Sequence, residues 1–162
     1  MVAFAAACAV AAPAAAMPVG GVSHVRSNHS ARARHLTRAR MLDFAWPAEG
    51  TVTTPFTAYH RGLDIGMLRT LDVRAAAAGK VVSVGHTTGF EGYGKIVLVQ
   101  VTPDVVTLYA HLASMTVHAG QTVAKGELLG IAGCTGYCTG THLHFEVRQN
   151  GVAVDPRKFL GG

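Results

Sequence analysis

The 162-residue sequence has few charged residues, which make up 14% of it, and it contains no internal repeat. So few charges argue against long solvent-exposed helices, which need a polar face. The 19 glycines instead require frequent turns. The length fits one domain of ordinary size together with a tail.

Acidic residues are missing from residues 17–40, and this gap explains the formal net charge of +5. Residues 41–162 hold nine of the 14 Lys and Arg residues and all nine Asp and Glu residues, so the expected domain is neutral. A neutral domain offers no basic stripe for nucleic acid. Residues 17–42 are predicted to be a basic disordered linker, either a solvated tether or a contact with an anionic cell-wall or membrane surface. The excess charge comes from Arg26, Arg32, Arg34, Arg38 and Arg40.

Residues 2–19 are almost entirely apolar and rich in alanine, but the charged start typical of an export signal is missing. A start codon assigned too late would explain that gap. Ala14-Ala15-Ala16 has the small-residue pattern of a cleavage site, so residues 1–16 are predicted to be a signal peptide. A membrane anchor is disfavoured because alanine is weakly hydrophobic and the run is barely long enough. Lipoprotein cleavage at Cys8 would leave a very short leader. The predicted location is secreted or cell-wall associated.

Only two of the three cysteines remain once such a leader is removed, and they lie close together. In an oxidising compartment, Cys134 and Cys138 can close a small disulfide loop. The spacing Cys-x-x-x-Cys-x-x-x-His also suits a metal site that includes His142. The disulfide is favoured for an exported protein.

Residues 43–162 are predicted to form one mainly β domain, starting near Phe44-Ala45-Trp46-Pro47. Short β-rich segments alternate with turn signals, a pattern that indicates antiparallel sheets or a sandwich. Residues 74–78 are alanine-rich but too short for a stable helix. The expected strands cover residues 51–54, 63–65, 80–86, 95–101, 105–111, 127–132, 141–149 and 152–154.

The segment from His142 to Val147 alternates polar and apolar residues. Successive side chains of a strand point to opposite faces, so His142, His144 and Glu146 are expected to share one face. Two imidazoles on one open face suit a metal ion. The same pattern also describes a half-buried strand that happens to carry two histidines.

Further candidate ligands lie elsewhere in the chain. His60 and Asp64 are four residues apart in a segment that reads as a loop entering a strand, and His111 ends a strongly β-patterned segment. Two or three histidines and one carboxylate are a normal ligand set for a catalytic zinc that keeps an open position. Four histidines and one aspartate therefore supply three ligands and two spare imidazoles for proton transfer or oxyanion stabilisation.

Three motifs in this order resemble the lysostaphin-type (LytM-like, M23) zinc metallopeptidases. The resemblance extends over most of residues 46–160, and it includes Gly92-Tyr93-Gly94. It implies antiparallel β-sheets that form a sandwich-like groove, of the LytM or duplicated hybrid motif type. The motifs are His60-x-x-x-Asp64, Tyr109-Ala110-His111-Leu112 and Gly136-x-x-x-Gly140-x-His142-x-His144-Phe145-Glu146.

The resemblance also implies roles for individual residues. His60, Asp64 and His144 would hold one Zn²⁺ per domain, and His111 and His142 would be the unligated catalytic histidines. Tyr59 is a weaker candidate for contacting substrate. Many relatives have small residues at the positions of Cys134 and Cys138. The two cysteines flank the turn before His142, so a bridge between them would stiffen that turn.

The activity implied is a zinc endopeptidase that cuts peptide bonds in bacterial peptidoglycan. Members of the family cut glycine bridges, D-Ala–diaminopimelate cross-links or L-Ala stem bonds, so the resemblance implies the class of substrate rather than one bond. The alternative is a non-catalytic LytM-like domain that binds and activates another cell-wall hydrolase. Such relatives typically lose ligands, whereas this sequence keeps all of them. A monomer is expected.

Overall fold

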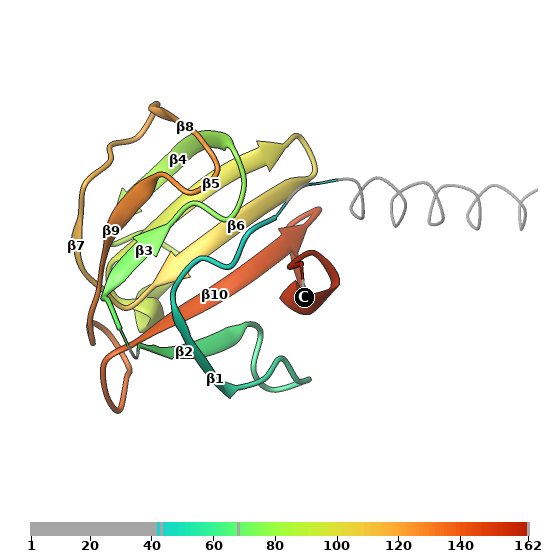
Figure 1. The fold of residues 1–162 in the computed structure, drawn as a ribbon. Helices are drawn as coiled ribbons and strands as arrows, with labels where there is room; N and C mark the ends of the chain where they lie inside the picture. The colour runs from blue at the N-terminus through green and yellow to red at the C-terminus, as the bar shows by residue number, and fades with distance from the viewer. Residues whose placement is uncertain (1–41, 43, 68, 162) are drawn as a thin grey trace, which may run out of the picture. The chain divides into compact units, whose positions relative to one another are not determined.

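A computed structural model of the chain describes residue 42, residues 44–67 and residues 69–161 (Figure 1). The predicted signal peptide, and the linker apart from Leu42, lie outside the described residues. Within the part that is described, no helix has the length and apolar character needed to cross a membrane.

The larger sheet has eight antiparallel strands and carries two of the predicted ligands, Asp64 and His144. Seven of them run in the order β1-β2-β10-β6-β5-β4-β8. Strand β11 pairs with the C-terminal part of β10, beyond the part that pairs with β2. The strands are β1 (Gly50–Thr54), β2 (Leu63–Met67), β4 (Gly79–Gly85), β5 (Ile96–Thr102), β6 (Val105–Ala110), β8 (Thr122–Val123), β10 (His142–Gln149) and β11 (Val152–Val154).

A smaller antiparallel sheet packs against one face of the larger one (Figure 1). It has the order β3-β9-β7, with β3 at Asp72–Arg74, β7 at Leu112–Met115 and β9 at Leu128–Ala132. Val73, Leu129 and Leu112 from this sheet join one core cluster with Phe145 and Val99 from the large sheet. The predicted mainly β, two-sheet class is therefore confirmed.

The observed elements differ from the prediction in a few places. Strands β3, β7 and β8 were not predicted, because two to four residues are too short to show an alternating pattern. The strand expected over 105–111 ends at Ala110, since His111 has a φ of 62° and leaves the extended conformation. Short 3₁₀ turns occupy Glu91–Tyr93 (η1) and Pro156–Lys158 (η2).

The alanine-rich segment forms no helix, as expected, and Ala75, Ala76 and Ala77 are buried in the core. Their small side chains let this segment run close to the large sheet. There the backbone N–H of Ala76 donates a hydrogen bond of 2.8 Å to the buried hydroxyl of Tyr109.

Strand β10 lies between β2 and β6 in the large sheet (Figure 1). Leu143, Phe145 and Val147 face the core and are completely buried. The opposite face is also largely covered, so His144 is 6% exposed and Glu146 is 0% exposed. Buried polar groups need hydrogen-bond partners, and these partners define the site.

Candidate metal and catalytic site

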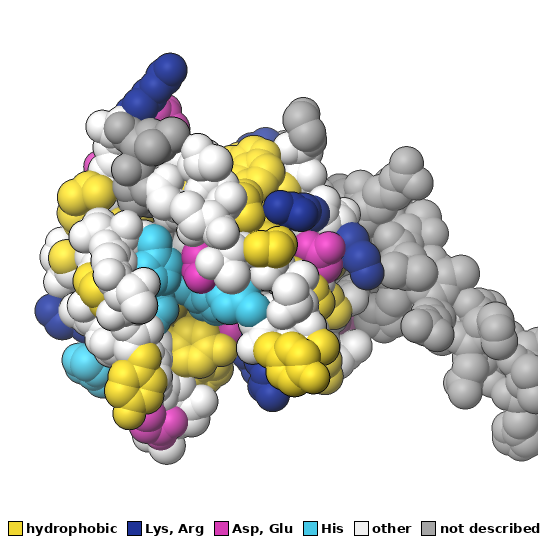
Figure 2. All heavy atoms as spheres, turned by 90° about the horizontal axis from the view of Figure 1, so that it is seen from below, with side chains coloured by type: hydrophobic (Ala, Val, Ile, Leu, Met, Phe, Trp, Pro, Cys, Tyr) yellow, Lys and Arg dark blue, Asp and Glu magenta, His cyan; other side chains and the backbone are white. Residues whose placement is uncertain are grey.

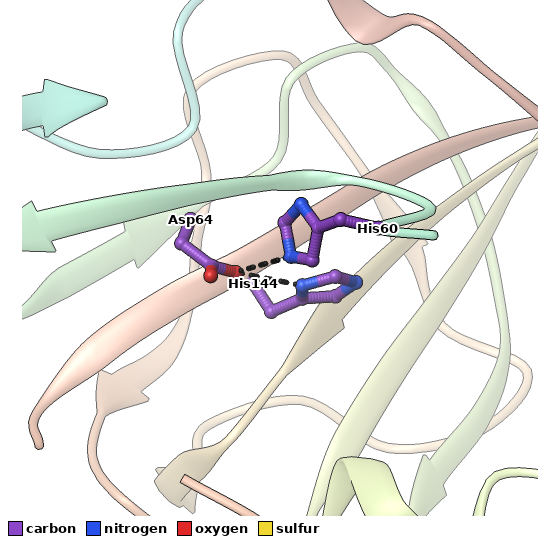
Figure 3. Close-up of side chains that lie close together, drawn as sticks. All are labelled: His60, Asp64 and His144. Carbon is purple, nitrogen blue, oxygen red and sulfur yellow. Dashed lines mark hydrogen bonds and ion pairs between the residues drawn. The ribbon is translucent and has the colours of Figure 1, made fainter. Parts of the chain in front are cut away.

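Strand pairing brings Asp64 and His144 together. In the β10–β2 register His144 lies directly opposite Asp64, and side chains at paired positions project to the same face of a sheet. Asp64 Oδ1 lies 2.8 Å from His144 Nδ1 and 3.1 Å from His60 Nε2, and Figure 3 shows the three side chains pointing toward one another. The ligand atoms of these three residues all lie within 4.8 Å of one another, as a shared metal requires.

A tight loop before β2 places the ring of His60. The backbone N–H of Thr57 donates to the carbonyl of His60, and the N–H of His60 donates to Thr57 Oγ1. Nδ1 of His60 lies 3.0 Å from the carbonyl oxygen of Pro55. A carbonyl only accepts, so Nδ1 carries the proton and the Nε2 lone pair faces Asp64.

The other two histidines of the motifs lie beside this trio. The ring centroids of His111 and His142 are 4.7 Å apart, and those of His111 and His144 are 5.9 Å apart. Nε2 of His142 lies 3.7 Å from Asp64 Oδ1. The structure therefore brings all five predicted metal and catalytic residues to one place.

Each of the four rings has one nitrogen directed at an acceptor other than Asp64, and in His60 and His144 the second nitrogen faces Asp64. The acceptors are three backbone carbonyls and one carboxylate, so the anchored nitrogen donates in each case. The pairs are His60 Nδ1 with Pro55 O, His111 Nδ1 with Thr135 O, His142 Nδ1 with Gly140 O, and His144 Nε2 with Glu146 Oε1. The four remaining nitrogens are the ones available to a metal ion or to proton transfer, and the rings that carry them line one cleft.

The turn before β10 fixes His111 through Thr135. Gly94 and Gly136 have φ of 66° and 75°, and a Cβ on either would collide with the backbone of the other segment. This close approach lets Thr135 Oγ1 accept from the Lys95 N–H and donate to the Leu112 carbonyl. The Thr135 carbonyl is thereby held 2.8 Å from His111 Nδ1.

A disulfide joins Cys134 and Cys138 across the same turn, with their Cα atoms 5.5 Å apart. The predicted pairing is therefore present in the structure, and the alternative Cys/His metal site is not formed. The bridge encloses Thr135, Gly136 and Tyr137. Cys138 and Tyr137 line the cleft.

Glu146 and Tyr93 complete the site, and the sequence motifs gave them no role. Glu146 accepts hydrogen bonds of 2.6 Å from the Tyr93 hydroxyl and 2.6 Å from Arg148 Nη1, besides the 3.2 Å contact with His144 Nε2. The period-two alternation that puts Glu146 on the face of His142 and His144 is the signal that identifies it. Tyr93 belongs to the Gly92-Tyr93-Gly94 part of the resemblance, but no sequence pattern predicts its contact with Glu146, which depends on the loop fold.

The electrostatics of the cluster favour a bound cation. Burial alone would raise the pKa of Asp64, but hydrogen bonding and the charge of His144 outweigh it and lower the pKa to about 2. Burial would lower the pKa of His144, yet hydrogen bonds to Asp64 and Glu146 raise it. The ring thus lies between two carboxylates that together attract positive charge. Two imidazole nitrogens and a carboxylate oxygen are a donor set that zinc prefers, so the residues fit the metal.

His111 has the opposite tendency. Burial lowers its pKa, and the nearby His142 and His144 add to this effect, although the hydrogen bond to Thr135 opposes it. Burial would likewise raise the pKa of Glu146, but the hydrogen bonds from His144 and Tyr93 hold it below its usual value. Burial and the bond to Glu146 raise the pKa of Tyr93 to about 12, so its hydroxyl remains a donor.

The cluster opens into a cleft of about 630 Å³. Figure 2 shows cyan histidine side chains and a magenta acidic side chain gathered in a hollow on this face. Tyr137, which is 89% exposed, lines the cleft together with Tyr93 and Thr139. Tyr59 is fully exposed beside His60 but is not part of the lining, so its contact with substrate stays a prediction.

Comparison with known families identifies the family of the chain. The model of peptidase family M23 matches residues 58–156, which is more than half of the chain. The chain belongs to peptidase family M23. The resemblance carried by the three motifs is thereby confirmed at the level of the family.

Two curated relatives of the chain come from Escherichia coli. The chain is 36% identical over 118 residues to the uncharacterized lipoprotein YgeR, covering 71% of this chain and 46% of the relative. It is 35% identical over 127 residues to the murein hydrolase activator NlpD, covering 76% of this chain and 33% of the relative. The chain thus matches less than half the length of either relative.

Two solved structures share the fold. A zinc-containing peptidase from Vibrio cholerae superposes with a TM-score of 0.64 at 29% identity, covering 70% of this chain and 39% of the other. The antimicrobial peptidase lysostaphin from Staphylococcus simulans superposes with a TM-score of 0.60 at 28% identity, covering 74% of this chain and 53% of the lysostaphin chain. Both likenesses support the lysostaphin-type fold that the sequence predicted.

Proposed function

We propose that this M23 chain is a zinc-dependent endopeptidase that hydrolyses peptide bonds in bacterial peptidoglycan, in stem peptides or cross-links. One observation carries the proposal: four imidazoles, each held through one nitrogen, line a single cleft together with Asp64. A structural zinc site is closed by four ligands, whereas three ligands with two spare imidazoles describe an open, catalytic one.

In this proposal His60, Asp64 and His144 hold one zinc ion. Bound zinc supplies a Lewis acid that polarises the scissile carbonyl and lowers the pKa of water toward neutrality. The carbonyl of Pro55 and the carboxylate of Glu146 hold the two ligand rings by their outer nitrogens, an arrangement that is general for histidine ligands.

His111 and His142 supply the proton transfers. Their Nδ1 protons are held by backbone carbonyls, so each ring can accept or deliver a proton only at Nε2. Between them they remove the proton of the attacking water, stabilise the developing oxyanion and return a proton to the leaving amine. The left-handed backbone of His111 is a strained conformation of the kind found at functional sites.

The proposed substrate and location rest on the comparisons. The names of the relatives and neighbours connect this fold with murein hydrolysis, with lipoproteins and with an antimicrobial peptidase. A disulfide also suits an oxidising, extracytoplasmic compartment. The protein is accordingly proposed to act as a monomer on peptidoglycan, secreted or associated with the cell wall.

A second candidate function is activation of another cell-wall hydrolase. The observation that favours it is the 35% identity to NlpD, whose name describes a murein hydrolase activator. This chain retains a complete donor set of His60, Asp64 and His144, which activation by binding alone would not require.

The deciding experiment is digestion of purified sacculi and defined muropeptides by the zinc-loaded protein, with new amino termini detected by mass spectrometry. His144→Ala and a chelated sample are the controls. We expect new amino termini from the wild type alone. A second arm adds the protein to a separate wall amidase. A zinc-loaded protein that releases no amino termini but stimulates the amidase supports activation and rejects the peptidase.

A further inference from the structure

Glu146 is the most deeply buried carboxylate among the described residues, and it takes no part in the proposed proton transfers. Its side chain is completely buried on β10, two residues after His144. We propose that Glu146 and Tyr93 are positioning residues, which hold His144 in the tautomer and orientation that a metal ligand needs. This inference rests on the proposed metal site and concerns what keeps that site in shape.

The hydrogen bonds of Glu146 indicate that its carboxyl group is ionised. The Tyr93 hydroxyl donates to Oε1, and the Arg148 guanidinium donates to Oε2, each at 2.6 Å. Arg148 also donates to the carbonyl of Gly151, so its position is fixed from two sides. A carboxylate beside a guanidinium is ionised and can only accept.

An ionised Glu146 determines where the proton of His144 lies. Oε1 is 3.2 Å from His144 Nε2, so this nitrogen must be the N–H donor. Nδ1 faces Asp64 Oδ1 at 2.8 Å, and while the one proton of the neutral ring is held on Nε2, a metal ion can take the lone pair of Nδ1 in place of that hydrogen bond. A lone pair facing a carboxylate is the arrangement that a cation between them satisfies.

Tyr93 also contacts a second histidine of the site, His111. Its ring packs edge-on against His144 at 5.2 Å between centroids and nearly parallel to the ring of His111 at 6.5 Å. The carbonyl of Tyr93 accepts the backbone N–H of His111 at 3.0 Å. One residue thus touches a proposed ligand, a proposed catalytic histidine and the buried carboxylate.

A merely structural role for this cluster would give different results. A buried ion pair such as Glu146–Arg148 contributes to stability through its own geometry, and losing it would destabilise the fold without changing the histidine tautomer. A positioning role changes the tautomer and the metal affinity. These two quantities can be measured on a protein that cleaves nothing.

The main test variant is Glu146→Gln, which keeps the shape but replaces one oxygen with an NH₂ group. That NH₂ must face either Arg148 or His144 Nε2, and both are donors in the wild type. The amide can relieve the conflict at His144 only by shifting the ring proton to Nδ1, which removes the lone pair. We expect zinc affinity, measured by chelator competition, to fall about 10- to 100-fold.

Tyr93→Phe removes only the hydroxyl and leaves the ring against both histidines. We expect a fall in zinc affinity at the lower end, about 10-fold, because Glu146 loses one of its two fixed donors. The matched control is Tyr109→Phe. It also removes a buried hydroxyl, one that pairs with the Ala76 N–H away from the cleft, so it should lower the melting temperature and leave zinc affinity unchanged.

A ring ¹⁵N NMR spectrum of the zinc-loaded wild type should show the His144 proton on Nε2, and zinc-free Glu146→Gln should show it on Nδ1. Unchanged zinc affinity and an unchanged tautomer in both variants would overturn the positioning role. If Glu146→Gln fails to fold, Tyr93→Phe decides by the same two measurements. A wild type that binds zinc but cleaves no peptidoglycan rejects the peptidase and leaves this affinity comparison valid.

Discussion

Asp64 and His144 lie directly opposite each other on adjacent antiparallel strands, and Asp64 Oδ1 is 2.8 Å from His144 Nδ1. The same oxygen is 3.1 Å from His60 Nε2 and 3.7 Å from His142 Nε2. One carboxylate thus lies at the centre of three imidazoles. Metal binding at this site is therefore expected to depend strongly on the charge of Asp64.

Asp64→Asn tests that dependence, because it keeps the volume and removes the charge. We expect zinc affinity to fall by more than about 100-fold, since outer-shell partners alone are worth about 10- to 100-fold. Chelator competition measures the change. Asp104→Asn, in the β5–β6 turn, alters the net charge equally and should bind zinc like the wild type. Equal zinc affinity in the two variants would contradict the role of Asp64.

His111→Asn separates proton transfer from metal binding. Asparagine tolerates the left-handed backbone that His111 adopts, so the fold should survive. We expect kcat on a muropeptide substrate to fall about 10²- to 10⁴-fold, with zinc affinity close to that of the wild type. His86→Asn, at an exposed position after β4, is the control and should retain full activity. Parallel loss of zinc would show that His111 is a ligand instead.

Removing the Cys134–Cys138 bridge should loosen the turn that holds Thr135. The loop is short, with a sequence separation of 4, so its entropic contribution is about 2 kcal/mol. The Cys134→Ser, Cys138→Ser double variant should melt several degrees below the wild type. Reductant should lower the wild type to the same temperature and leave the variant unchanged. Intact mass should rise by about two hydrogens on reduction, and two free thiols in exported protein would reject the bridge.

Much of this site could be predicted from the sequence because local patterns carry it. The alternation from His142 to Val147 fixed which side chains share a face, and β10 has that arrangement. The apolar half of the pattern also indicated the buried side, where Leu143, Phe145 and Val147 pack. The order of the three histidine motifs was enough to indicate the family.

The remaining features depend on approaches between segments distant in sequence. Tyr93 meets Glu146 across 53 residues, and the Thr135 carbonyl reaches His111 across 24. The backbone contact between Gly94 and Gly136 brings those segments together. No periodic pattern encodes such contacts. The end of β6 at Ala110 was likewise missed, because the β pattern of the sequence continues through His111 although its backbone is left-handed.

Gly62 offers a test of how closely the backbone must approach His144. A Cβ on Gly62 would lie 2.8 Å from both Cε1 and Nε2 of His144 and 2.6 Å from the carbonyl oxygen of Phe145. Gly62→Ala should therefore displace the His144 ring from Glu146 and weaken zinc binding. Overpacking of this kind costs about 1–3 kcal/mol, which thermal unfolding of the metal-free protein can measure. Gly140→Ala is the matched control. Gly140 also contacts a histidine of the site, since its carbonyl lies against His142 Nδ1, but a Cβ on Gly140 would meet nothing within 4 Å. If both variants bind zinc equally well, the contact between Gly62 and His144 does not hold the ring.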